Sequence, residues 1–310
     1  MKNVSIGGDV TNSVMVFGNN NHVIKIGDVN GGIVNIIQPS NQPKFSARSA
    51  PVMLRPRPFP SLLDRENELD LIKKAVATSA PVSIWGQQGI GKTSFVRQLT
   101  HLLDASNFPN GIIHLSASHL GTEDLLQAIF DSLFESQTTY KPTTTEIRHA
   151  LKDIKALIFL DDLSINQDDV LSMMDAAPNS LFILSGVERS LWGEGEIISL
   201  RGLPEAEALK LFEKELSRPL NEQEKEMTAQ ICTLLQGHPL HILQMAALAR
   251  ETGRPLVSIL RDVKSEPVSE KSATTISMAN LGNPEKKLLA LLSAAGGNIL
   301  VAGTRQKNIP

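Results

Sequence analysis

The eight residues at 86–93, GQQGIGKT, constrain the fold of this chain more than any other stretch. They match the pattern G-x-x-x-x-G-K-[ST], follow the apolar run 81–85, and precede a segment, 94–103, with apolar residues at helical spacing. In that setting, glycines let successive backbone N–H groups face one centre, and the helix adds its positive dipole end. The pattern therefore predicts a phosphate-binding loop, with Lys92 at the β- and γ-phosphates and the Thr93 hydroxyl on Mg²⁺. A glycine-rich structural turn is the alternative.

Short apolar runs alternate with helical patterns over the middle of the chain, which is typical of an α/β protein. Such alternation predicts a parallel sheet with helices on both faces, joined by right-handed crossovers. The predicted strands are 81–85, 111–116, 156–160, 181–185 and 196–200.

The strand predicted at 156–160 runs directly into two acids, Asp161 and Asp162. Ligands of open α/β sheets bind at the carboxyl ends of the strands. Mg²⁺ beside a phosphate loop takes a hydroxyl and an acid, so we expect Asp161 to bind it together with Thr93. Asp162 would orient or deprotonate the water that attacks the γ-phosphate. The alternative is that both acids only cap the turn after the strand.

Arg189 lies in the loop that follows the strand predicted at 181–185. Two interpretations stay open for it: a sensor of the γ-phosphate, or a solvated loop arginine. Among the histidines, only His238 and His241, at i and i+3, have the spacing of metal ligands, and His238, between a glycine and a proline, is interpreted as a turn residue. The single cysteine excludes a cysteine-based zinc cluster.

Residues 1–38 form an internal repeat of about ten residues, each unit a Gly/Asn/Asp turn followed by alternating apolar residues. Gly8-Asp9-Val10, for example, recurs as Gly27-Asp28-Val29. Isolated hairpins are marginal in water, so this β-repeat must stack on something. We predict an oligomerisation or effector-recruiting module, with a sheet packed inside the monomer as the alternative.

The composition shifts divide the rest of the chain. Residues 39–60 carry repeated prolines and predict a linker, and 61–200 hold the phosphate loop and the predicted strands. Strands then stop, and 201–265 predict a helical subdomain. Residues 266–310 predict a linker followed by a last helical unit that is incomplete.

Composition narrows the class of protein. A net charge of −3 without blocks of like charge gives no sign of a nucleic-acid surface. The single cysteine, Cys232, excludes an internal disulfide and lies among apolar residues, which favours a buried structural thiol. The N-terminus has no apolar signal segment, and glycines interrupt the apolar window 288–303, so we expect a cytoplasmic protein without a membrane span.

Several motifs in order resemble those of bacterial NB-ARC-like STAND P-loop NTPases. The resemblance covers roughly residues 61–265. It rests on LDRE at 63–66, the phosphate loop at 85–93, LIFLDDL at 157–163, the start of the helical subdomain at 200–212, and GHPL at 237–240.

The resemblance implies a five-stranded sheet in the order 2-3-4-1-5, and a winged helix that begins near residue 279. It also implies a signalling switch: an ADP-bound off state, an ATP-bound homo-oligomeric on state, and slow Mg²⁺-dependent ATP hydrolysis. A protein trigger or effector would be its partner.

The resemblance adds Arg65 and Pro239 as contacts of the nucleoside. The residues expected to bind ATP or ADP are Arg65, Gly86, Gly89, Ile90, Gly91, Lys92, Thr93, Ser94 and Pro239. The residues expected to act on the γ-phosphate are Lys92, Asp161, Asp162 and Arg189. The family motif has its arginine two residues after a Ser or Thr, whereas Arg189 is four residues after Ser185.

Two further functions fit the same residues. One is a continuously cycling P-loop ATPase that remodels a partner. The other is a non-hydrolysing scaffold that assembles through the β-repeat.

Overall fold

A computed structural model of the chain describes residues 3–7, 13–17, 22–26, 33–37, 45–59, 64–136 and 140–265. The chain divides into two compact units, residues 1–46 with 136–140, and residues 47–135 with 141–310. The linker and incomplete winged helix predicted at 266–310 lie outside the described residues, as do the turns of the β-repeat. In the part of the chain that is described, no helix has the length and apolar content of a membrane span.

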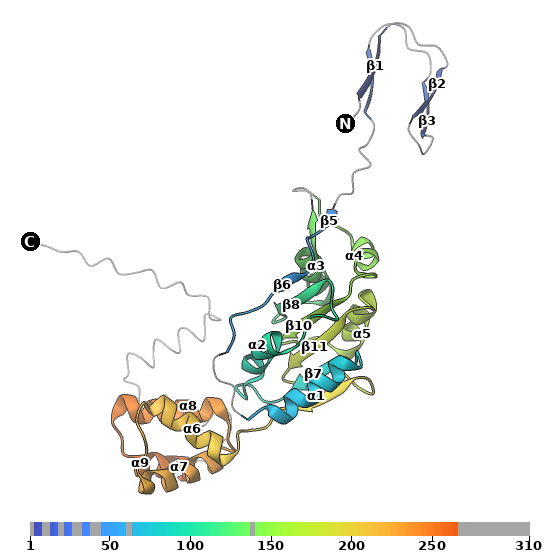
Figure 1. Cartoon of the computed structure of the whole chain (residues 1–310). Helices are drawn as coiled ribbons and strands as arrows, with labels where there is room; N and C mark the ends of the chain where they lie inside the picture. The colour runs from blue at the N-terminus through green and yellow to red at the C-terminus, as the bar shows by residue number, and fades with distance from the viewer. Residues whose placement is uncertain are drawn as a thin grey trace, which may run out of the picture. The chain divides into compact units, whose positions relative to one another are not determined.

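A six-stranded sheet forms the centre of the larger unit (Figure 1). Its order is β12-β7-β11-β10-β8-β6, and every pair is parallel. Numbered from the first strand after α1, the five strands β7 to β12 have the order 2-3-4-1-5, which confirms the predicted α/β fold. The bounds are β7 Val82–Trp85, β8 Gly111–Ser116, β10 Ala156–Asp161, β11 Leu181–Gly186 and β12 Glu196–Ser199.

The sixth strand, β6 (Val52–Leu54), comes from the stretch predicted to be a proline-rich linker. It extends the sheet beyond β8, with Val52 opposite Gly111 and Leu54 opposite Ile113. A Cβ atom on Gly111 would lie 1.9 Å from the Val52 carbonyl oxygen, so only glycine permits this approach. No local pattern indicates β6, because its hydrogen-bonding partner β8 lies more than fifty residues away.

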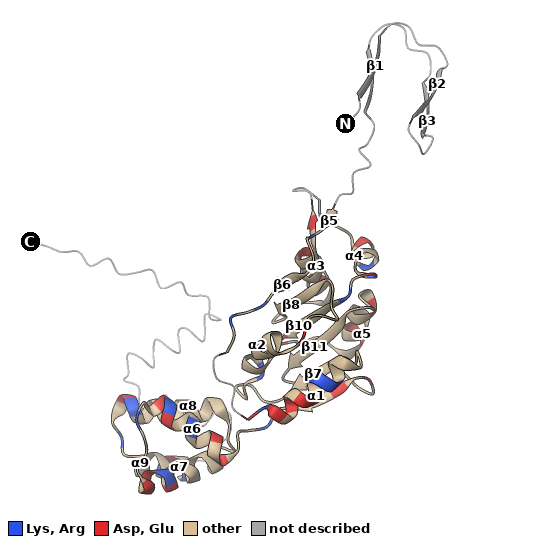
Figure 2. Ribbon diagram, viewed as in Figure 1, with Lys and Arg blue, Asp and Glu red and all other residues tan. Residues whose placement is uncertain are grey.

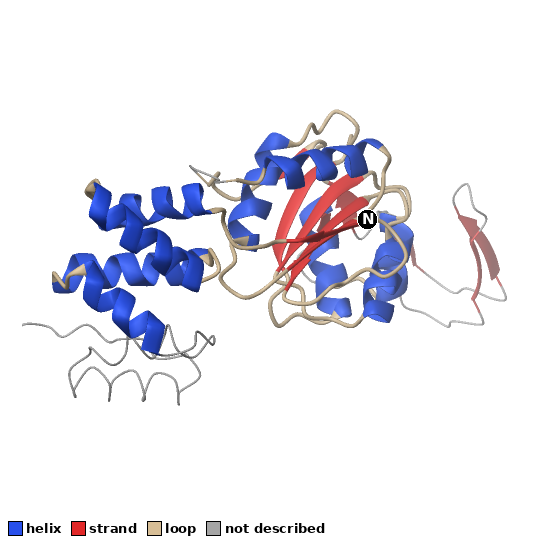
Figure 3. Ribbon diagram, turned by 90° about the horizontal axis from the view of Figure 1, so that it is seen from below, coloured by secondary structure: helices blue, strands red, loops and turns tan. Residues whose placement is uncertain are grey.

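Helices cover both faces of this sheet (Figure 3). One face packs against α1 (Glu66–Ala77) and α2 (Lys92–Leu102), through residues such as Ile72, Phe95 and Phe159. The next residue of β10, Leu160, is also fully buried, as expected of a parallel strand enclosed from both sides. The helices α3 (Thr122–Leu133), α4 (Thr144–Leu151) and α5 (Gln167–Ala176) contact one another, and α3 contacts β8. Figure 2 shows the charged residues mainly on helices and loops.

Arg65, and not the acid before it, takes the cap position at the start of α1. Asp64 has left-handed backbone geometry, with φ of 47°, and Arg65 takes the N-cap position without a side-chain cap bond. The Arg65 side chain instead donates hydrogen bonds to the Glu68 carboxylate and the Arg201 carbonyl oxygen.

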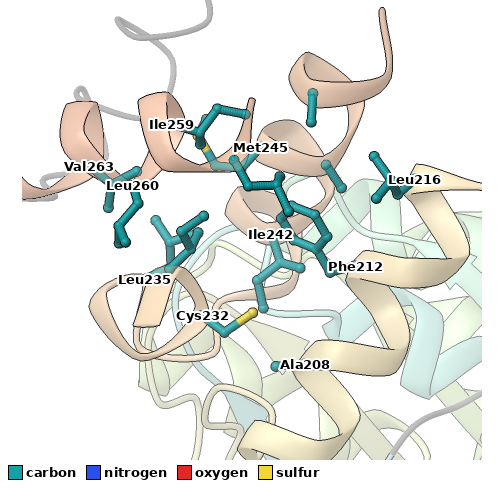
Figure 4. Packing of buried hydrophobic residues seen from close by; sticks show 14 of the residues in the cluster. Ala208, Phe212, Leu216, Cys232, Leu235, Ile242, Met245, Ile259, Leu260 and Val263 are labelled. Carbon is teal, nitrogen blue, oxygen red and sulfur yellow. The ribbon is translucent and has the colours of Figure 1, made fainter. Parts of the chain in front are cut away.

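Four helices, which together are called the helical subdomain, follow β12: α6 (Glu205–Leu216), α7 (Glu222–Leu234), α8 (Pro239–Thr252) and α9 (Leu256–Ser265). Their apolar faces meet in one core, in which Phe212, Ile242 and Met245 are fully buried (Figure 4). Cys232 lies in that core, and burial raises the pKa of its thiol to about 12. A neutral, buried thiol fits the structural role predicted for it.

In the first unit, four short strands pair in two separate two-stranded sheets. The outer sheet joins β1 (Asn3–Gly7) to β4 (Ile33–Ile37), and the inner one joins β2 (Ser13–Phe17) to β3 (His22–Ile26), both antiparallel. Two further short strands, β5 (Phe45–Ala47) and β9 (Phe134–Ser136), pair with each other.

Candidate functional site

The loop between β7 and α2 has the backbone of a phosphate cradle. Gly89 and Gly91 have φ of 81° and 101°, values that side-chain-bearing residues rarely adopt. Gly91 is the N-cap of α2, so the helix begins at Lys92 and directs its first free N–H groups toward the loop. This arrangement of backbone N–H groups at a helix start attracts an anion such as phosphate.

The Lys92 ammonium group lies within this loop and is largely buried. Its Nζ donates to the Gly86 and Gln87 carbonyl oxygens, at 2.8 and 2.9 Å. Burial lowers the pKa of Lys92, while the negative charges of Asp162 and Asp161 oppose that shift. The ammonium group can readily exchange its two neutral carbonyl partners for phosphate oxygens, because hydrogen bonds between charged groups are stronger.

The two predicted carboxylates lie at the carboxyl end of β10. Asp161 is buried, and its Oδ1 accepts a 2.5 Å hydrogen bond from Ser185 Oγ on the neighbouring strand β11. Asp162 has a left-handed backbone, with φ of 62°, and its N–H donates to the same Ser185 Oγ at 3.3 Å. Ser185 therefore holds the Asp161 carboxylate and the Asp162 backbone. Left-handed backbone geometry at a residue other than glycine is found often at functional sites.

The phosphate loop contacts the helical subdomain directly. His238 Nε2, just before α8, donates to the Gln88 carbonyl oxygen at 3.0 Å. A Cβ atom on Gly89 would lie 2.7 Å from Leu240 Cδ2, so the loop and the turn into α8 are in close contact. His238 also stacks on His241, with ring centroids 4.0 Å apart.

The segment that joins β12 to α6 is also closely packed. Arg65 Nη2 donates to the Arg201 carbonyl at 2.8 Å, and Leu203 N–H donates to the Gly237 carbonyl at 2.8 Å. A Cβ atom on Gly202 would lie 1.9 Å from the Gln236 carbonyl oxygen. These contacts hold the segment after β12 against the turn that precedes α8.

A cavity of about 690 Å³ lies where the loop, the sheet edge and the helical subdomain meet. Its volume is in the range of small-molecule sites. The predicted site residues that line it are Arg65, Gly89, Ile90, Gly91, Lys92, Thr93, Ser94, Asp161, Asp162 and Pro239. The sequence therefore predicted a set of residues that the fold brings to one place, from positions as far apart as 65 and 239.

Two predicted site residues do not line the cavity. Gly86 directly follows β7. Its carbonyl oxygen accepts from Lys92 Nζ, and a Cβ atom on Gly86 would lie 2.9 Å from the Leu200 carbonyl oxygen. Arg189 is held by its own loop: its Nε donates to the Leu191 carbonyl at 2.6 Å, and its guanidinium lies 4.4 Å from the centre of the Trp192 ring. The structure therefore does not bring Arg189 to the phosphate loop.

Several lining residues were not expected from the sequence. They are Phe59, Gln88, Val187, Leu203, Leu211, Lys214, Glu215, Leu240 and Leu243. Those of the helical subdomain are mostly apolar, whereas the phosphate loop and β10 contribute polar groups. Of this set, Gln88, Leu203, Leu211 and Leu240 lie inside motifs that the sequence displays, and the others carry no local signal.

The residues present fit Mg²⁺. Thr93 and Asp161 line the same cavity and offer the hydroxyl and carboxylate oxygens that this ion prefers. Within the described ranges, no cluster of three or more His, Cys, Asp or Glu residues could hold a metal by itself. That pattern fits an ion that takes few protein ligands and completes its shell with water and phosphate.

Comparison with known families gives one match, which covers slightly more than half of the chain. Residues 65–222 match the NB-ARC domain. A comparison with curated protein sequences finds no match.

Similar folds occur among solved structures. A Walker-type ATPase of Pyrococcus abyssi is 14% identical, with a TM-score of 0.44 over 76% of this chain and 89% of that one. A STAND protein with a tetratricopeptide-repeat sensor from Pyrococcus horikoshii is 21% identical, with a TM-score of 0.46 over 78% of this chain and 36% of that one. The RuvB branch-migration motor of Thermotoga maritima is 16% identical, with a TM-score of 0.40 over 79% and 80%.

Proposed function

The chain belongs to the NB-ARC domain family of nucleotide-binding P-loop signalling ATPases, and from this premise we propose that it is an ADP/ATP switch. In the proposed cycle, ADP holds an off state and ATP an oligomerising on state. Slow Mg²⁺-dependent hydrolysis returns the on state to the off state. One observation carries the proposal: the phosphate loop and the Pro239 turn of the helical subdomain line one cavity.

A ligand that fills this cavity touches both domains, which is what a switch requires. The nucleotide-binding domain supplies the polar groups for phosphates, and the helical subdomain supplies Leu211, Leu240 and Leu243 for an apolar base. A ligand shifts a conformational equilibrium only as far as its contacts differ between the two states. ADP and ATP differ at the γ-phosphate, and we assign its recognition to Lys92, Asp161 and Asp162.

The proposed roles follow from the site. Lys92 exchanges its two carbonyl partners for phosphate oxygens, and Arg65 and Pro239 contact the nucleoside. Thr93 and Asp161 would hold Mg²⁺, which neutralises charge on the phosphates when bound. Asp162 orients the attacking water, while Ser185 holds the Asp161 carboxylate and the Asp162 backbone in place. Arg189 has no place in this proposed site.

Turnover separates the switch from a continuously cycling motor. In a steady-state assay with purified protein, Mg²⁺ and ATP, we expect far less than the roughly 1–10³ per second of typical enzymes. A switch that waits for a trigger should hydrolyse ATP slowly by itself. Many turnovers per minute without any partner would contradict the switch and favour the motor.

The paired strands β1 to β4 support assembly through the N-terminal unit. Each of the two sheets has only two strands, so the backbone N–H and C=O groups along its outer edges are unpaired within these sheets. Such edges are templates for pairing with another chain. We propose that copies of residues 1–38 pair in the on state.

Deleting residues 1–38 should abolish assembly and leave ADP affinity unchanged. The cavity is built from residue 59 onward, so the deletion removes none of its lining. Light scattering with ATP measures the particle mass, and calorimetric titration measures ADP affinity. A truncated chain that still assembles would contradict the role given to the repeat, and a truncated chain that no longer binds ADP would show that the repeat supports the nucleotide site.

A further inference from the structure

The segment 55–59 leaves the edge strand β6 and runs beside α2 (Figure 1). Its last residue, Phe59, lines the cavity. The NB-ARC match begins only at residue 65, so this segment lies before it. The sequence predicted a solvated linker here. The contacts of this segment with β8 and α2 indicate a different role.

Three anchors fix the segment before it reaches the cavity. The first is β6 itself, which pairs with β8 and whose Val52 N–H donates to the Asn110 carbonyl at 3.1 Å. The second is the Pro56 carbonyl, which accepts from His101 Nε2 at 2.8 Å. The third is the Arg57 carbonyl, which accepts from Arg97 Nε at 3.2 Å and Nη2 at 2.9 Å.

Both side chains that hold the segment belong to α2, the helix that begins at the phosphate loop. Pro56 and Pro58 lock two of the five backbone φ angles, which lowers the entropy lost on ordering. The segment is therefore fixed relative to the phosphate loop by one rigid helix. The residue that follows these anchors is Phe59.

Phe59 is half-buried and lines the cavity together with the phosphate loop and Pro239. Among the described residues that line the cavity, it is the one aromatic side chain. A flat aromatic ring and apolar leucines in a cavity that also holds a phosphate cradle suit a planar heterocycle carrying a phosphate chain.

We propose that Phe59 is a base-stacking residue of the nucleotide site, held in place by Arg97 and His101. The inference rests on the proposed function, because it assigns a residue to the base of the same ligand. Stacking acts on any base, so Phe59 strengthens binding of the nucleoside part and not of the phosphates. Arg97 is a positioning residue that acts through Phe59.

The test compares ADP with inorganic tripolyphosphate, which lacks a base, by calorimetric titration of the full chain. Phe59→Ala should weaken ADP binding about tenfold or more and leave tripolyphosphate binding unchanged, and Phe59→Tyr should restore ADP binding. Phe45→Ala is the matched control, a half-buried phenylalanine that does not line the cavity. Parental ADP affinity in Phe59→Ala, or an equal loss for both ligands, would overturn the proposal.

A double-variant cycle tests the anchor. Arg97→Ala should weaken ADP binding, but it should add nothing to Phe59→Ala, because residues that act as a unit are not additive. Full additivity would overturn the positioning role of Arg97. A parent chain that binds tripolyphosphate but no ADP would instead refute the proposed function, so the two failures are distinguishable.

Discussion

Replacing Lys92 with alanine is expected to cause a severe loss of ADP and ATP binding while the chain stays folded. The ammonium group is buried inside the phosphate loop, where removal of a charged partner of a phosphate costs about 2–5 kcal/mol. By titration the affinity should therefore fall by roughly 30-fold to several thousand-fold. Circular dichroism measures whether the fold is retained.

Lys73→Ala is the matched control for that variant. Its side chain is 52% exposed on α1 and makes only a surface ion pair of 3.8 Å with Asp70. It should bind ADP as the parent does. If Lys92→Ala binds ADP as well as the parent, the phosphate site has been placed in the wrong loop.

Replacing Asp161 with asparagine is expected to remove the effect of Mg²⁺ on ATP binding. The substitution keeps the size of the side chain and an oxygen that can accept from Ser185, but it removes the charge that would attract the ion. Titrations with ATP in Mg²⁺ and in EDTA should differ by about tenfold or more for the parent and should coincide for the variant.

Asp162→Asn separates metal binding from hydrolysis. It should keep the Mg²⁺ effect on binding, yet lower ATP turnover by about 10²–10⁴-fold, as expected for loss of a group that orients or deprotonates water. An Asp161→Asn variant that keeps the full Mg²⁺ effect would contradict the metal role. An Asp162→Asn variant with parental turnover would contradict the role in hydrolysis.

The sequence predicted the features that depend on local pattern. The phosphate loop, the five strands after α1 in the main sheet and the acids at the end of β10 each have a signal within a few residues, because buried parallel strands are rich in apolar residues and end at the ligand edge. The spacing of apolar residues also predicted helices after residue 201, and the core residues Phe212 and Ile259 of these helices are fully buried.

What the sequence did not predict depends on contacts between distant residues. The strand β6 is only three residues long, and its partner β8 lies more than fifty residues away. Phe59 is hidden among prolines, and its place in the cavity depends on Arg97 and His101. For Arg189 the sequence position suggested a contact with the γ-phosphate, but contacts with Leu191 and Trp192 hold the side chain within its own loop.

The contacts between the phosphate loop and the helical subdomain were also not predicted, because they too join residues that are distant in the sequence. His238 reaches the Gln88 carbonyl across 150 positions, a partnership that no short motif encodes. His238 takes the turn position before α8, and the proline beside it gives no sign of the hydrogen bond to the phosphate loop.

Whether the cavity binds an adenine nucleotide is the central claim, and thermal unfolding with and without ADP tests it most directly. The purified chain should release ADP on denaturation, and ADP at about 100 times its dissociation constant should add about 2.7 kcal/mol of stability. For a chain of this size the Tm should rise by roughly 5 °C or more. Protein that carries no nucleotide, and whose Tm neither ADP nor ATP changes, would contradict the account.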